Sequence, residues 1–189
     1  MSDLRSLHPM TVLSLTLPDT LSRPVARARI RGAVRQTLAA CLDQPVTSIE
    51  LLARPGYPLT LVVPKIPINL SISHAPGLSV AAIHQSASVG IDLMQVDTDE
   101  VDMPDWERVA QDYLGPYARH RLAEAPPSRR ARHFAQEWTR FEAGLKCLGL
   151  ALTEWTPALA QRLANCRVVA LALPDNYCGA LATAAICPA

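Results

Sequence analysis

The sequence predicts an α+β protein, in which helices and strands occupy separate stretches of the chain. The first observation is a helical pattern over residues 24–43, with apolar residues at helical spacing. The second is a series of short apolar runs between residues 49 and 94, separated by turn signals such as Pro76-Gly77. The third is a helix-rich stretch that ends near residue 150 and is followed by two further strands.

Each element has a local reason in the sequence. The helix at 24–43 opens at Pro24, and Arg27, Arg31 and Arg35 share one face because they are four residues apart. The later helical region is interrupted by a predicted loop at 125–128. Strands are expected within 49–63 and at 70–73, 78–84, 88–94, 167–173 and 177–186.

An acidic stretch divides the chain. Residues 96–105 contain five acidic side chains and a proline, so we place a boundary there, between an N-terminal half (1–97) and a C-terminal half (98–189). Leu78–Ile83 (LSVAAI) resembles Leu181–Ile186 (LATAAI), which hints that the halves repeat one unit. The hint is weak, because short alanine-rich strands resemble one another by chance.

Composition excludes several classes of function. The 189 residues carry 18 basic and 17 acidic side chains, so the net charge of +1 gives no electrostatic case for nucleic acid. No apolar stretch approaches the roughly 18 residues that span a bilayer, and the N-terminus lacks a signal-peptide pattern. We therefore expect a soluble, cytoplasmic protein with no membrane partner. The five cysteines show neither zinc spacing nor a disulfide framework, which favours buried thiols.

A helix at 134–149 places two charged residues beside an apolar stripe. Glu142 and Lys146 are one turn apart on the border of that stripe. An exposed pair at this spacing contributes only a few tenths of a kcal/mol. The alternative is a half-sheltered pair with a chemical role. The stripe consists of Phe134, Trp138, Phe141, Leu145 and Leu148.

Two further polar residues stand in strand contexts. Asp92 shares one face of its strand with Gly90 and Met94, and it either caps a turn at the strand end or is a functional carboxylate beside the gap left by Gly90. His74 ends a strand before Pro76-Gly77. Such a histidine is either structural or reaches a ligand.

These segments together resemble one family. Asn69–His74 (NLSISH), Gly90-Ile-Asp92 and Trp138–Lys146 (WTRFEAGLK) are similar to motifs of the 4′-phosphopantetheinyl transferases of the surfactin-synthetase-activating type. The order and spacing agree over most of the chain, from about residue 26 to residue 182. Three more segments agree with the family pattern: Ala26–Arg31 (ARARIR), Gly56-Tyr57-Pro58 and Tyr177–Ala182 (YCGALA).

The resemblance implies a fold and an activity. Members of this family transfer the phosphopantetheine arm of coenzyme A to a serine of an apo acyl or peptidyl carrier protein and release adenosine 3′,5′-bisphosphate. The implied fold is two similar α+β halves packed as a pseudo-dimer within a monomer, with coenzyme A in the cleft between them. The alternative is a catalytically impaired relative that acts as a coenzyme A- or carrier-protein-binding module.

The resemblance also implies roles for five residues. Asp92 and Glu142 would hold Mg²⁺, with Mn²⁺ as a possible substitute, and Glu142 could accept the proton of the carrier serine. Lys146 would hold a diphosphate oxygen. His74 would bind the 3′-phosphate of coenzyme A, with Arg27 as a further cation near the nucleotide.

The sequence departs from the family pattern at a few positions. Met94 stands where a second acid is usual, and because a thioether is a poor ligand for a hard cation, we expect water there and weaker metal binding. Phe141 and Tyr57 replace basic residues, and the place of Phe141 in the apolar stripe predicts a core position for its ring. Five arginines make the C-terminal helical region basic, either as a docking face for an acidic carrier or as a merely solvated face: Arg119, Arg121, Arg129, Arg130 and Arg132.

Overall fold

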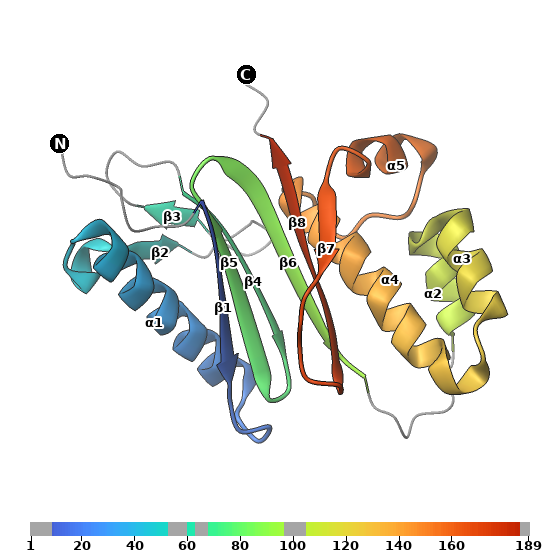
Figure 1. Ribbon diagram of the computed structural model, residues 1–189, viewed down its shortest axis with the longest axis horizontal. Helices are drawn as coiled ribbons and strands as arrows, with labels where there is room; N and C mark the ends of the chain where they lie inside the picture. Colours follow the sequence, from blue (N-terminus) through green and yellow to red (C-terminus); the bar gives the residue numbers. More distant parts are fainter. Residues whose placement is uncertain (1–8, 53–59, 63–67, 97–104, 186–189) are drawn as a thin grey trace.

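The computed structural model describes residues 9–52, 60–62, 68–96 and 105–185. Two long helices lie on either side of two three-stranded antiparallel sheets, and a separate two-stranded sheet is also present (Figure 1). In chain order the elements are β1 (Met10–Thr16), α1 (Arg23–Leu42), a 3₁₀ turn (Val46–Ser48), β2 (Glu50–Leu52), β3 (Thr60–Val62), β4 (Asn69–Ala75), β5 (Leu78–His84), β6 (Ala87–Gln95), α2 (Trp106–Tyr113), α3 (Gly115–Glu124), α4 (Pro127–Cys147), α5 (Pro157–Leu163), β7 (Arg167–Ala170) and β8 (Tyr177–Ala185).

The N-terminal unit is helix α1 packed on the sheet β1-β5-β4. Strand β5 is central and pairs antiparallel with both neighbours. Helix α1 turns Ile30, Val34 and Leu38 toward the sheet, and all three are fully buried against residues that include Leu70 and Ile83. The apolar spacing of 24–43 thus forms the core side of α1, and the helix covers the sheet with large aliphatic side chains.

The C-terminal unit is helix α4 packed on the sheet β6-β8-β7, with α2 and α3 beside α4 (Figure 1). Strand β8 is central and pairs antiparallel with β6 and β7. Small residues form the contact between helix and sheet: Ala143 and Cys147 of α4 pack against Ala180 and Ala182 of β8. The helix therefore lies close to the strands.

The two units meet where β4 and β5 lie beside β6. Val89, Ile91 and Leu93 face the first unit and share an apolar cluster with Val80 and Ala82 of β5. The alternating pattern predicted for 88–94 is confirmed, because Gly90, on the opposite face of β6, contacts α4. At this junction β6, which contains Asp92, lies beside β4, which contains His74.

The α+β class and most of the predicted elements are confirmed. Two elements were not predicted, β1 and the short helix α5, and β7 ends at Ala170, earlier than predicted. The similar segments at 78–83 and 181–186 contribute to β5 and β8, the central strands of their sheets, although residue 186 lies outside the described residues.

The predicted boundary after residue 97 also lies outside the described residues, and it stays a prediction. Strand β6 precedes that boundary in the chain but pairs with β8, which follows it. Gly56-Tyr57-Pro58 is likewise outside the described part of the chain. Within the described ranges, no helix combines the length and apolar character that crossing a bilayer requires.

Candidate active site between the two sheets

Asp92 lies in the middle of β6, where it pairs with Ala180 of β8. Its side chain is buried, and the Oδ1 oxygen accepts a hydrogen bond from Ser73 Oγ at 2.9 Å and one from Lys146 Nζ at 2.6 Å. The interpretation of Asp92 as a cap at the end of a strand is therefore wrong. A buried carboxylate in the middle of a strand is stable here because a cation and a hydroxyl compensate its charge.

The gap expected beside Asp92 at Gly90 is closed by helix α4. A Cβ atom at position 90 would collide with the carbonyl oxygen of Ala143 and the backbone nitrogen of Cys147. Gly90 is thus the residue that lets the helix backbone approach β6. This close approach brings Lys146, the neighbour of Cys147, within reach of the strand.

Lys146 points from α4 across to β6. Besides its ion pair with Asp92, its ammonium donates to the carbonyl oxygen of Ile91 at 3.2 Å and lies 3.5 Å from Ser73 Oγ. The interpretation of Lys146 as one partner of an exposed helical pair with Glu142 is therefore wrong. Its ion pair is with Asp92, which lies 54 positions away in the chain.

Glu142 is half-buried one turn before Lys146 and shares the electrostatic environment of Asp92. Burial raises the pKa of Glu142, and the negative charge of Asp92 raises it further, while the ammonium of Lys146 partly opposes both effects. The two carboxylates therefore interact electrostatically with each other, and the ammonium of Lys146 interacts with both.

A metal ion at this site would depend on ligands other than protein side chains. Among the described residues, no group of three or more His, Cys, Asp or Glu side chains is placed to hold a metal. Magnesium commonly takes one or two carboxylates and completes its octahedron with phosphate oxygens and water. Asp92 and Glu142 are two such carboxylates. Met94 does not add a third oxygen ligand, and its side chain packs against two apolar clusters.

Phe141 occupies the core, as its place in the apolar stripe predicts. Its side chain is buried, and its ring lies 6.3 Å from that of Trp138 and 6.5 Å from that of Tyr113. This aromatic cluster fixes the far side of α4 and so helps to hold the Glu142–Lys146 side toward β6.

His74 lies near the end of β4, on the α1 side of the site. Its Nδ1 atom is 2.9 Å from Ser79 Oγ. Burial lowers the pKa of His74 to about 4, and the positive charges of Arg27, Arg23, Arg31 and Lys146 contribute in that order. The imidazole is neutral near pH 7, and it stands in a field that attracts anions.

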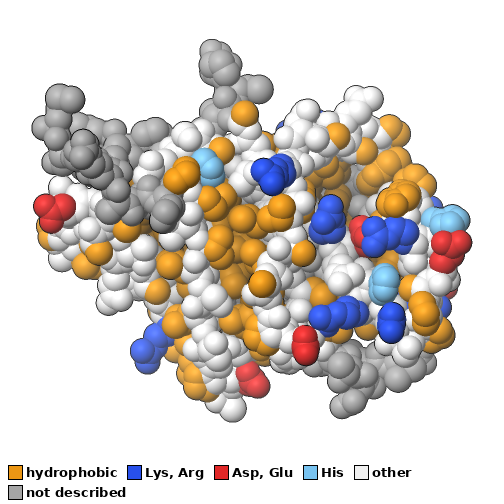
Figure 2. All heavy atoms as spheres, viewed as in Figure 1, with side chains coloured by type: hydrophobic (Ala, Val, Ile, Leu, Met, Phe, Trp, Pro, Cys, Tyr) orange, Lys and Arg blue, Asp and Glu red, His pale blue; other side chains and the backbone are white. Residues whose placement is uncertain are grey.

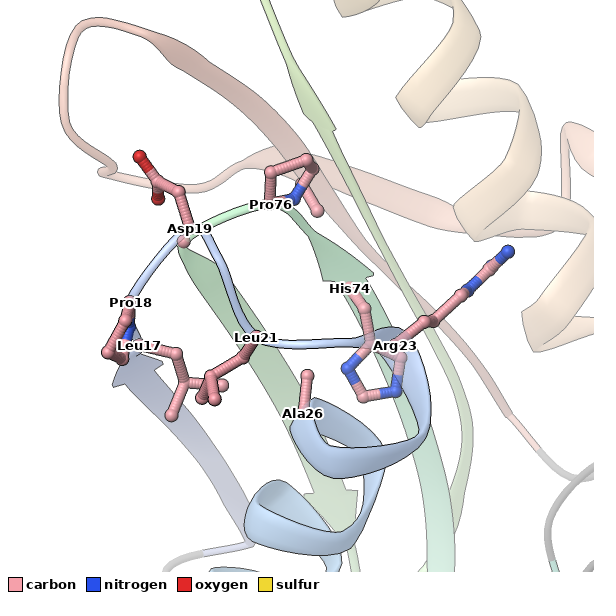
Figure 3. Close-up of a pocket in the computed structure, with 10 residues that line it drawn as sticks. Leu17, Pro18, Asp19, Leu21, Arg23, Ala26, His74 and Pro76 are labelled. Carbon is pink, nitrogen blue, oxygen red and sulfur yellow. The ribbon is translucent and has the colours of Figure 1, made fainter.

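A cavity of about 410 Å³ opens beside His74. It is lined by the segment after β1, the start of α1 and the turn between β4 and β5, including Arg23, Ala26 and Pro76. Figure 3 shows the His74 ring beside the first turn of α1, with the Arg23 side chain extending past it. Arg27 is exposed on the same helix, four residues further on. The structure thus brings His74 and Arg27 into one basic region.

Sequence reasoning missed two contributors to the site. Arg23 extends the four-residue spacing of Arg27 and Arg31 backward by one turn, but it stands before Pro24, where the predicted helix began. Ser73 precedes His74, and its contact with Asp92 joins residues that are 19 positions apart. A buried serine in a strand is a weak signal on its own.

The basic helical region carries contacts within the molecule. Arg121 pairs with Glu137 at 3.0 Å, Arg132 donates to the carbonyl oxygen of Asp175 at 2.6 Å, and Arg130 stacks over the ring of Trp106. On the face in Figure 2, basic side chains gather over the helical side of the C-terminal unit, whereas the middle is mostly hydrophobic. Three of the five arginines therefore have structural contacts.

Comparison with known families supports the resemblance in this region. Residues 88–173 match the family model described as the 4′-phosphopantetheinyl transferase superfamily, ACPS. The matched segment runs from β6 to just beyond β7 and contains Asp92, Glu142 and Lys146, while Arg27 and His74 precede it. No curated protein matches the chain. The match covers 86 of the 189 residues, so it is a similarity of this segment to the superfamily.

Proposed function

We propose that this protein transfers the 4′-phosphopantetheine arm of coenzyme A to a serine of an apo acyl or peptidyl carrier protein, in a magnesium-dependent reaction that releases adenosine 3′,5′-bisphosphate. We also infer that it is of the surfactin-synthetase-activating type, with its two α+β units arranged as a pseudo-dimer. One observation carries the proposal: Asp92 and Lys146 meet at 2.6 Å inside the segment that matches the superfamily, with Glu142 in the same electrostatic cluster.

The reaction is a displacement at phosphorus. The serine oxygen forms a bond to the β-phosphorus of coenzyme A, the bond to the bridging oxygen breaks, and the nucleotide leaves with that oxygen. Negative charge develops on the phosphoryl and leaving oxygens, so positioning and charge neutralisation supply most of the catalysis. Lys146, with three donors on a flexible stem, would neutralise a diphosphate oxygen.

Glu142 is suited to accept the proton of the serine. A general base works best when its pKa approaches the working pH, and in the metal-free site burial together with the charge of Asp92 raises the pKa of Glu142, an effect that a bound cation would oppose. Asp92 is paired with Lys146 at 2.6 Å, and the phosphate oxygens of coenzyme A would compete for that ammonium.

Asp92 and Glu142 would hold the Mg²⁺ ion. When bound, the ion neutralises the diphosphate charge and orients the phosphoryl group. Two carboxylates leave coordination positions for phosphate oxygens and water, which agrees with a site where Met94 supplies no oxygen ligand.

The basic region around His74 would hold the nucleotide end of coenzyme A. Neutral His74 would donate a hydrogen bond to the 3′-phosphate, while Arg27 and Arg23 supply charge. The 410 Å³ cavity beside these residues gives room for part of the nucleotide. The remainder would extend along the junction toward Lys146.

The test is incubation with an apo carrier protein, coenzyme A and Mg²⁺, followed by intact-mass measurement of the carrier. We expect the mass of the phosphopantetheine arm to be added to the carrier, and no addition when the carrier serine is replaced by alanine or when EDTA removes the metal. Asp92→Asn and Glu142→Gln keep side-chain shape and should abolish transfer while thermal unfolding shows an intact fold. Near-normal turnover in either variant would refute the metal assignment.

The same assay addresses the binding-module alternative. Calorimetry with coenzyme A accompanies the mass measurement. Tight binding of coenzyme A without any mass gain, across acyl and peptidyl carriers and with Mg²⁺ or Mn²⁺, would show a binding protein instead of a transferase.

A further inference from the structure

Backbone N–H groups on the edge of β6 that faces β4 are hydrogen-bonded by side chains instead of by another strand. Strand β6 pairs with β8 along its other edge, whereas β4 belongs to the separate sheet of the N-terminal unit. Backbone N–H groups buried at such a junction require acceptors. Two serines of β4 supply them: Ser71 Oγ accepts from the N–H of Ile91 at 3.0 Å, and Ser73 Oγ accepts from the N–H of Leu93 at 3.2 Å.

The two serines are nearly equivalent in place. Both are buried, they are two residues apart on one face of β4, and each binds the N–H of a residue on β6 with the same two-residue spacing. Side-chain hydroxyls thus take the position that a main-chain carbonyl would take in a continuous sheet. Both serines fasten the N-terminal unit to the strand that carries Asp92.

Only Ser73 also contacts the candidate active site. Its hydroxyl donates to Asp92 Oδ1 at 2.9 Å, and its oxygen lies 3.5 Å from Lys146 Nζ. A hydroxyl has one donor and two acceptor positions, so these contacts and the Leu93 N–H use its full capacity. Within the described part of the chain, both bonds to the Asp92 carboxylate end on Oδ1, which leaves Oδ2 as the oxygen available to a ligand.

We propose that Ser73 is a positioning residue. It fixes the rotation of the Asp92 carboxylate so that Oδ2 is presented to the metal and diphosphate. It also links the orientation of that carboxylate to the position of β4. Ser71 makes only the fastening bond. The proposal rests on the transferase function proposed above. Groups that orient a metal-binding carboxylate typically alter metal affinity or activity about 10- to 100-fold when removed.

The test compares Ser73→Ala with the matched variant Ser71→Ala. Each variant leaves one buried N–H without its acceptor, so we expect both to lower the unfolding midpoint Tm by a few degrees, with the larger decrease in Ser73→Ala, which also removes the hydrogen bond to Asp92. Only Ser73→Ala should lower kcat, by about 10-fold, with the KM for coenzyme A within about twofold of wild type. Ser71→Ala should change kcat by less than about twofold, because Asp92 keeps its hydroxyl partner.

Metal binding gives a readout that does not depend on turnover. Mn²⁺ is titrated into each protein in the presence of saturating coenzyme A, and free Mn²⁺ is followed by electron paramagnetic resonance. We expect the Kd for Mn²⁺ to rise about 10-fold in Ser73→Ala and to return most of the way in Ser73→Thr, which restores a hydroxyl. Ser71→Ala should bind Mn²⁺ as wild type does.

The outcomes separate this proposal from the function on which it rests. If wild type transfers phosphopantetheine but Ser73→Ala and Ser71→Ala have equal kcat and equal Mn²⁺ affinity, Ser73 has no positioning role and the transferase assignment stands. If Ser73→Thr fails to restore either quantity, the hydroxyl is not the cause and the proposal is overturned. If wild type neither transfers nor binds Mn²⁺, both proposals fail.

Discussion

Helices α1 and α4 cover their sheets in different ways. Helix α1 faces its sheet with large side chains such as Ile30 and Leu38, which hold the helix backbone away from the strands. Helix α4 faces its sheet with small residues such as Ala143, which packs on Ala180, and its backbone reaches Gly90 of β6. Similar components, a long helix on three strands, thus produce two different spacings.

The spacing decides where charged side chains can act. Close approach of α4 lets Lys146 cross to β6, where its partly buried ammonium pairs with the buried carboxylate of Asp92. On α1, Arg23 and Arg27 stay exposed and act on His74 through their charge. The comparison distinguishes a closely packed side, which holds an ion pair against a strand, from a solvated, basic side, which attracts anions.

The largest expected effect separates these two sides kinetically. Lys146→Met should lower kcat by about 10²- to 10³-fold, because its ammonium, held by the ion pair with Asp92, is the preorganised charge of the site. Arg27→Met, the matched change on α1, should mainly raise the KM for coenzyme A, by about 10-fold, with little change in kcat. Steady-state kinetics with an apo carrier measures both, and a kcat loss in Arg27→Met as large as that in Lys146→Met would remove the distinction.

The close packing of α4 predicts the next effect. In Gly90→Ala the added Cβ meets backbone atoms of Ala143 and Cys147, which cannot rotate away as side chains do. We expect a loss of about 1–3 kcal/mol or more in the free energy of unfolding, measured by urea denaturation, because the helix must move from the sheet. Unchanged stability would show that α4 does not depend on this contact.

His74 gives a pH-dependent comparison. The unfolded chain binds a proton at His74 below about pH 6.5, whereas the folded protein, with the pKa lowered to about 4, does not until the pH is far lower. The unfolded state therefore binds more protons in this window, and the folded state loses stability as the pH falls from about 6.5 to about 4. His74→Gln should flatten this slope.

Urea titrations at several pH values would show the difference between wild type and His74→Gln, and identical slopes would contradict the lowered pKa. Subtracting the two curves isolates His74 from other groups, including Glu142, whose raised pKa acts with the opposite sign.

The sequence predicted most of the fold because periodicity is a local property. The apolar spacing of α1 and the alternation of 88–94 appear in their own residues, and both are confirmed. Strand β1 was missed because only Leu13 and Leu15 alternate with polar residues in it and its other side chains are polar or partly exposed. The short helix α5, which begins after the capping residue Thr156, has too few turns to show a period.

The sequence motifs identified the candidate site residues but not the contacts between them. Asp92, Glu142 and Lys146 were identified as candidates, but the ion pair between Asp92 and Lys146 depends on how closely α4 approaches β6. That distance is set by Gly90 together with alanines on β8, which are far apart in sequence. Ser73 contributes through a long-range contact, for which a single sequence contains no spacing rule.

The smallest expected effect completes the comparison of the two helices. Gly32 lies inside α1, and a Cβ atom added there would meet no atom within 4 Å. Because glycine in a helix interior costs about 0.5–1 kcal/mol relative to alanine, Gly32→Ala should raise the free energy of unfolding by about that amount. Urea denaturation of Gly32→Ala and Gly90→Ala compares the same added methyl group in the two units, and the changes in the free energy of unfolding should have opposite signs. A destabilised Gly32→Ala would mean that α1 also packs against a neighbour at this position, and the loose spacing assigned to the N-terminal unit would be wrong.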